Sequence, residues 1–201
     1  MLKYVMEELS RIPIFPLNIL PLPGEHIPLH IFEMRYRELL LDAEEKEVDF
    51  GILYAHETNK SRIGSLVQLE SIIKKYDTGE SDIIVKCIDT FILSKFYSRL
   101  SGKLYPGGEV FFLNAMDEVE VSAVLKDEFE EYMELRRIKL EQKEYNIHDV
   151  VNELDLDTQD RLKYLKLLTA DKRNSFVKER LQFRKFILEQ ELSQKDTFYL
   201  N

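Results

Sequence analysis

The chain has little cysteine and no long apolar run, and both absences bear on where it works. Its 201 residues include a single cysteine, Cys87, so no disulfide can form within the chain. A lone thiol inside an apolar run, residues 83–88, is typical of a buried structural residue in a reducing compartment. No apolar run approaches the roughly 20 residues that are needed to span a bilayer. We therefore expect a cytoplasmic protein without membrane attachment.

The chain also has fewer cations than anions. It carries 28 lysines and arginines against 37 aspartates and glutamates, a formal net charge of −9. Nucleic-acid binding takes its affinity from clustered basic side chains that displace counterions from phosphates. An acidic chain without an obvious basic cluster is repelled by such a backbone. The composition therefore argues against a nucleic-acid partner.

Glycine and proline are scarce, and both are confined to the first 108 residues. All 6 prolines precede residue 107, and neither residue type occurs after Gly108. Because glycine and proline mark turns and end helices, this split predicts strands first and helices afterwards. We place the boundary between residues 116 and 117. A β lobe then spans residues 1–116, and a helical lobe spans residues 117–201.

The β lobe contains short runs of β-branched and aromatic residues that are separated by turns. The strands predicted from these runs span residues 12–17, 27–31, 50–54, 62–74, 83–96 and 109–115. Residues 33–45 show the periodicity of one amphipathic helix. Prolines inside the first two runs favour edge strands or bulges, because proline cannot donate to a sheet ladder. The pattern predicts an α+β protein, with a bent sheet or partly closed barrel, one short helix and then the helical lobe.

The longest predicted helix, residues 172–192, closes the helical lobe. At about 100° per residue, Arg180 and Arg184 fall between two apolar stripes of this helix. Cations in that position either extend to water or meet acidic partners. We expect one of these arginines to contact a carboxylate of the acid-rich helix that follows the boundary, which carries Glu128, Glu130, Glu131 and Glu134.

The sequence contains no motif that indicates catalysis. The string nearest to a phosphate-binding loop, Ser101 to Leu104, lacks the upstream glycine and the hydroxyl, and we interpret it as a turn. His26, His30 and Glu33 are residue types that bind zinc. Proline between the two histidines argues against a helix there, and on a strand residues four apart lie roughly 13 Å from each other. We therefore assign no catalytic residue, no metal ligand and no cofactor.

One dense motif in the β lobe carries a family resemblance. It consists of an F-P-L string, a P-G turn and a P-L-H-I-F-E-x-R-Y string. The residues that form it are Phe15, Pro16, Leu17, Pro23, Gly24, Pro28, Leu29, His30, Ile31, Phe32, Glu33, Arg35 and Tyr36. In this order the motif closely resembles the amino-terminal domain of Lon proteases. At Asp89 and Thr90 the chain departs from the family, which often has Gly and Arg there.

The resemblance implies a PUA-like β lobe (the fold type of pseudouridine synthase and archaeosine transglycosylase) followed by a helical lobe. The chain ends at Asn201, where a Lon protease continues into its ATPase and peptidase domains. The resemblance thus implies a free-standing, non-catalytic module that recognises protein segments or acts as an adaptor for a protease. The client and the oligomeric state stay open. The alternative is RNA binding, because PUA-like folds also serve that purpose.

The candidate binding site is the apolar segment of Leu20, Pro21, Leu22 and Pro23. These four residues are either packed inside the protein or displayed to solvent. If they are displayed, they form the kind of apolar patch that marks a protein-binding surface.

Overall fold

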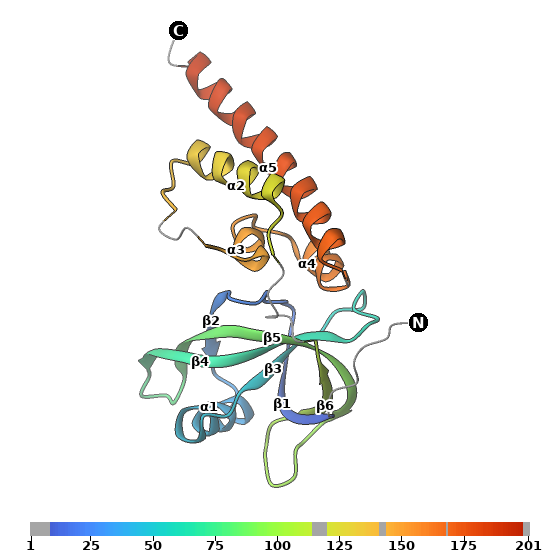
Figure 1. Ribbon diagram of the computed structural model, residues 1–201. Helices are drawn as coiled ribbons and strands as arrows, with labels where there is room; N and C mark the ends of the chain where they lie inside the picture. Colours follow the sequence, from blue (N-terminus) through green and yellow to red (C-terminus); the bar gives the residue numbers. More distant parts are fainter. Residues whose placement is uncertain (1–8, 114–119, 141–143, 168, 199–201) are drawn as a thin grey trace. The chain divides into compact units, whose positions relative to one another are not determined.

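A computed structural model describes residues 9–113, 120–140, 144–167 and 169–198, with side chains up to residue 194. The chain divides into two compact units, residues 1–117 and 118–201 (Figure 1). Residues 114 and 115, the end of the predicted sixth strand, lie outside the described residues.

The first unit contains a six-stranded mixed sheet. Its strands are β1 (Ser10–Leu17), β2 (His26–Ile31), β3 (Phe50–Tyr54), β4 (Ile63–Lys75), β5 (Ser81–Tyr97) and β6 (Gly107–Phe112). They follow the order β2-β5-β4-β3-β1-β6, and β5 also pairs with β6 (Figure 1). β1 and β3 are parallel, whereas the other pairs are antiparallel. The predicted α+β class and strands are confirmed, and the sheet is partly ring-like rather than a barrel.

Helix α1 (Met34–Lys46) places an apolar face in the core of this unit. The core residues on this face are Tyr36, Leu39, Leu40 and Ala43. The Tyr36 ring stacks on Phe15 of β1, with the ring centroids 3.9 Å apart. Burial of each large apolar side chain stabilises the unit by about 1.5–3 kcal/mol. The helix predicted from periodicity is confirmed, and its outer face is left to solvent.

The prolines of β1 correct one expectation about the sheet. β2 is an edge strand, as Pro28 predicts, but β1 lies between β3 and β6. Residues 10–13 of β1 pair only with β6, and residues 14–17 pair only with β3. Each half of β1 therefore pairs with a single neighbouring strand, as an edge strand does. Pro13 and Pro16, which have no N–H to donate, are tolerated in such a strand.

Phe91 of β5 fits into the core because two neighbouring positions are glycine. Its side chain is fully buried. A Cβ atom added to Gly51 would lie 2.7 Å from the Phe91 ring, and one added to Gly64 would lie 2.3 Å from it. These distances are shorter than van der Waals contact, so a larger residue at either position would displace the ring. The two glycines, in β3 and β4, thus make room for the Phe91 ring and do not serve as turn residues.

The second unit consists of α2 (Ala123–Leu135), α3 (Ile147–Asn152), α4 (Thr158–Leu165) and α5 (Ala170–Phe198). Asn146 starts α3 with a capping box, because its side chain accepts from Asp149 N while Asp149 accepts from Asn146 N. Val177 and Leu181 of α5 are fully buried. None of the helices in the described part of the chain has the length and apolar character that crossing a membrane requires.

The expected pairing of the α5 arginines with the acid-rich helix α2 is wrong. Arg180 Nε lies 3.0 Å from Asp160 Oδ2 of α4, and Arg184 donates to the backbone oxygen of Asp155 at 2.6 Å. The acids of α2 instead meet lysines, in the ion pairs Lys178–Glu128 (3.4 Å) and Lys185–Glu131 (2.5 Å). The charges of α2 and α5 do complement each other through the lysines of α5. The two arginines instead contact α4 and the loop before it.

Candidate functional site

Two large apolar side chains are exposed next to each other at the start of α1. Met34 has 69% of its surface exposed, and Leu104, in the loop between β5 and β6, has 46% exposed. Together with Glu33, Arg35 and Arg99 they line an open groove of about 430 Å³. We call this feature the α1 groove. Adjacent exposed apolar residues on one concave surface are typical of a binding site, whereas single exposed ones are common.

Met34 faces the solvent because of its place on α1. The helix begins after Glu33, whose backbone is extended (φ −72°, ψ 136°). Residues 36, 39, 40 and 43 form the buried face, and Met34 and Leu41 lie outside it. The Glu33 carboxylate does not cap the helix but accepts from Arg35 Nε at 2.9 Å. The first turn therefore presents an apolar side chain next to an ion pair.

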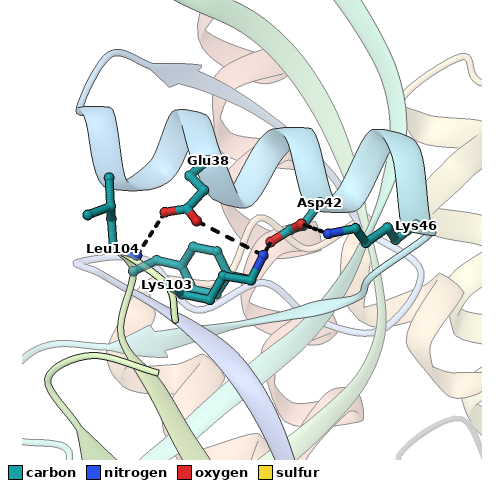
Figure 2. Close-up of polar contacts among 6 residues, drawn as sticks. Glu38, Asp42, Lys46, Lys103 and Leu104 are labelled. Carbon is teal, nitrogen blue, oxygen red and sulfur yellow. Dashed lines mark hydrogen bonds and ion pairs between the residues drawn. The ribbon is translucent and has the colours of Figure 1, made fainter. Parts of the chain in front are cut away.

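The loop that carries Leu104 is held by carboxylates of α1. Glu38 accepts from the backbone N–H of Leu104 at 2.7 Å. Asp42 accepts from Lys46 Nζ (2.5 Å), from the Tyr105 hydroxyl (2.5 Å) and from Lys103 Nζ. Figure 2 shows Glu38 and Asp42 pointing from α1 toward the loop, with Leu104 beside the start of the helix. Polar contacts on both sides of Leu104 thus fix its backbone while its side chain stays exposed.

The same loop also packs against the core of the first unit. Tyr105 is buried in the core, and Leu100 packs against that core. Leu100 fits because residue 107 is glycine, since a Cβ there would lie 2.3 Å from the Leu100 side chain. Gly102 has φ of +72°, in the left-handed region that glycine adopts most readily. The α1 groove is therefore formed by a tightly held loop rather than by a long free segment.

Charge at the α1 groove is organised by Asp42. Burial alone would raise the pKa of the Asp42 carboxyl, but hydrogen bonds from Lys103, Lys46 and Tyr105 outweigh it and hold that pKa well below its usual range. Burial, with the adjacent Asp42, raises the pKa of the Tyr105 hydroxyl. At neutral pH Asp42 is thus ionised and the Tyr105 phenol keeps its proton, which suits structural support rather than proton transfer.

The predicted site residues Leu20, Pro21, Leu22 and Pro23 lie elsewhere, in the connection between β1 and β2. All four are buried, with Leu20 2% and Leu22 1% exposed. The Pro21 carbonyl accepts from Ser65 Oγ at 2.6 Å, and Gly24 N donates to Cys87 O at 2.9 Å. Of the two arrangements considered for this segment, the structure shows the packed one. A role in binding stays a prediction.

The motif residues are divided between the core and the surface. Phe15 and Tyr36 stack in the core, whereas Phe32 is 56% exposed and precedes the α1 groove. Gly24 has φ of +85°, as the P-G turn requires. Pro23 and Ile31 are also buried. The other motif positions are half-buried or exposed, namely Pro16, Leu17, Pro28, Leu29, His30, Glu33 and Arg35. The part of the motif that begins α1 is thus at the surface.

The two histidines of β2 are both exposed. His30 Nδ1 lies 2.6 Å from Asp82 Oδ1, and its Nε2 lies 3.6 Å from Glu80 Oε2. Tyr76 donates to the other Asp82 oxygen at 2.7 Å. This cluster joins β2 to the hairpin between β4 and β5. In the described part of the chain, no group of three or more histidine, cysteine or carboxylate side chains is arranged to bind a metal ion.

Sequence reasoning missed Met34, Arg99 and Leu104. It interpreted Ser101 to Leu104 as a turn, and residues 101 and 102 do form one. The turn's importance comes from contacts across the chain, because Lys103 and its partner Asp42 are 61 positions apart. The available signal was Met34, an apolar residue on the solvent-facing side of the first turn of α1. The sequence pattern alone does not show which loop lies beside it.

Comparisons with solved structures show the fold. A crystal structure of a Lon N-terminal domain protein from Xanthomonas campestris is 22% identical, with a TM-score of 0.65 over 82% of this chain and 94% of that one. The N-terminal domain of a Lon protease from Mycobacterium avium complex is 16% identical, with a TM-score of 0.56 over 86% and 98%. No protein with a curated description matches significantly. The family model of the substrate-binding domain of ATP-dependent protease La (Lon) matches residues 11–192, and the chain therefore belongs to that family.

Proposed function

We propose that this chain is a recognition module that binds extended or unfolded protein segments, and that the α1 groove contacts an apolar side chain of the segment. The observation that carries the proposal is the pair of exposed side chains, Met34 and Leu104, that line the same groove. Membership of a substrate-binding family supports the same kind of ligand. Catalysis by this chain is not part of the proposal.

The geometry favours a weak contact with an extended segment. Covering two apolar side chains contributes about 1.5–3 kcal/mol for each one that becomes fully buried. Association and the ordering of a flexible segment offset much of that gain. A single groove of this kind therefore suits affinities weaker than micromolar, because a dissociation constant of 1 μM already requires about 8 kcal/mol of net binding free energy. Weak binding to many sequences is what a module for unfolded proteins, or an adaptor that delivers them to a protease, requires.

Serine at both apolar positions tests the proposal. The double variant Met34→Ser, Leu104→Ser should bind a fluorescently labelled unfolded protein about tenfold more weakly in an anisotropy titration, because both apolar contacts are removed. Its free energy of unfolding should change by less than about 0.5 kcal/mol, as is usual for exposed residues.

Ile73→Ser is the matched control for this experiment. Ile73 is 63% exposed and lies on β4, outside the α1 groove. Its replacement should leave the affinity unchanged. Equal losses from the control and the double variant would show that binding follows general surface hydrophobicity and would contradict the role of the groove. Wild-type protein that fails to bind any unfolded segment would contradict the proposed function itself.

A second contact for the segment remains proposed at Leu20 to Pro23. Because Leu20 and Leu22 are buried, serine at either position should destabilise the protein strongly, by about 2–5 kcal/mol for a large-to-small core change. Binding measurements on such variants would therefore be confounded by unfolding. This is why the exposed pair in the α1 groove provides the sharper test.

A further inference from the structure

The charged side chains around the α1 groove differ in whether they have a partner within the protein. Glu33 accepts from Arg35, and Glu38 accepts from the backbone of Leu104. Asp42 has contacts from two lysines and a tyrosine. Each of the three carboxylates near the groove thus already has a donor within the protein.

Arg99 differs from these groups. Its side chain is exposed and lines the α1 groove together with Met34 and Leu104. Within the described residues its guanidinium has neither an ion pair nor a hydrogen-bond acceptor. Arg35, the other guanidinium at the groove, pairs with Glu33 and lies over the Tyr36 ring at 4.6 Å. Arg99 is therefore the cation that a ligand can engage without first displacing a partner.

We propose that the α1 groove selects extended protein segments in which an acidic side chain lies close to an apolar one. The inference rests on the proposed function and names the class of segment. The apolar side chain contacts Met34 and Leu104, and the carboxylate accepts hydrogen bonds from Arg99. A guanidinium binds a carboxylate through two parallel N–H donors, a geometry that an ammonium group cannot reproduce.

The net charge of the whole protein opposes a preference for acidic segments. A net charge of −9 repels acidic segments at long range. At physiological ionic strength this long-range field is screened over about 8 Å, whereas a contact pair is screened much less. A preference for acidic segments at that ionic strength would therefore come from a local cation and not from the overall field.

Three short peptides with blocked ends test the selection. They share a central Phe-Leu pair and differ only at the two flanking positions, which are Glu, Gln or Lys. In anisotropy titrations at physiological salt, the wild-type protein should bind the Glu peptide about three- to fivefold more tightly than the Gln peptide, the range that an exposed ion pair supports. The Lys peptide should bind more weakly than the Gln peptide.

Variants of Arg99 assign the effect to one residue. Arg99→Gln should remove the difference between the Glu and Gln peptides and leave the affinity for the Gln peptide unchanged. Arg99→Glu should reverse the order, so that the Lys peptide binds best. Lys60→Gln is the charge-matched control, because Lys60 is exposed in the connection between β3 and β4 and lies outside the α1 groove. It should behave like the wild-type protein.

The outcomes separate this inference from the proposed function. If the wild-type protein binds all three peptides equally, or if Arg99→Gln retains the preference, the selection is overturned while the proposed function stands. If Lys60→Gln loses the preference as Arg99→Gln does, the effect belongs to net charge and the selection is again overturned. If no peptide binds to folded wild-type protein, as judged by its circular dichroism, the proposed function fails and the selection fails with it.

Discussion

At the scale of single residues, Asp42 connects α1 to the loop between β5 and β6. Only 7% of its side chain is exposed, and it accepts from Lys46, Lys103 and Tyr105. Asp42→Asn keeps the shape but removes the charge that both lysines face. We expect a loss of about 1–3 kcal/mol in the free energy of unfolding, measured by urea denaturation. The same variant should bind unfolded segments more weakly, because Lys103 adjoins Leu104 in the α1 groove.

The pH dependence of that loss checks its electrostatic origin. The folded protein holds the pKa of Asp42 below its usual value, whereas an unfolded aspartate titrates near about 3.9. The stabilisation is therefore complete at neutral pH and declines as the pH falls below about 4. Wild type and Asp42→Asn should differ fully at pH 7 and converge in acid. Asp77→Asn, in an exposed turn, should show neither effect. A difference that is constant down to the acid limit would contradict an ionised Asp42.

At the scale of elements, α5 forms ion pairs with α4 and with α2 through different residues. Arg180 Nε lies 3.0 Å from Asp160 of α4, and both side chains are largely shielded, at 28% and 17% exposed. We expect Arg180→Ala to lower the free energy of unfolding by about 1 kcal/mol, more than a typical surface change, through lost packing as well as lost charge. A double-mutant cycle of Arg180→Ala with Asp160→Asn should give a measurable coupling energy, and a cycle with Glu128→Gln should give none. The reverse result would restore the pairing with α2.

Elements whose signal is local could be predicted from the sequence, and those that depend on distant partners could not. The strands and α1 follow from runs and periodicities within each segment. The place of β1 in the sheet does not, because it exchanges β6 for β3 between Pro13 and Ile14. The α1 groove is of the same kind. Leu104 was recognisable as part of a turn, but its position next to Met34 depends on Glu38 and Asp42.

At the scale of the whole molecule, the division into two units gives a prediction for limited proteolysis. Domain boundaries fall where few contacts cross, and proteases cut such connections first. Residues 114–121, of which 114–119 lie outside the described residues, contain no lysine or arginine but include Glu118 and Glu120. Trypsin therefore cannot cut there, whereas a glutamate-specific protease can.

We expect the glutamate-specific protease to cut first after Glu118 or Glu120 and to yield two fragments that match the units, residues 1–117 and 118–201, within a few positions. Mass spectrometry of early time points identifies the cut. Glu57 and Glu80 are built-in controls, because they lie in short connections between paired strands, where the backbone is held on both sides. A first cut at Glu57 or Glu80 would show that the sheet opens more readily than the connection. The first unit would then not be the stable body on which a fixed α1 groove depends, and the explanation for the exposed Leu104 would fail with it.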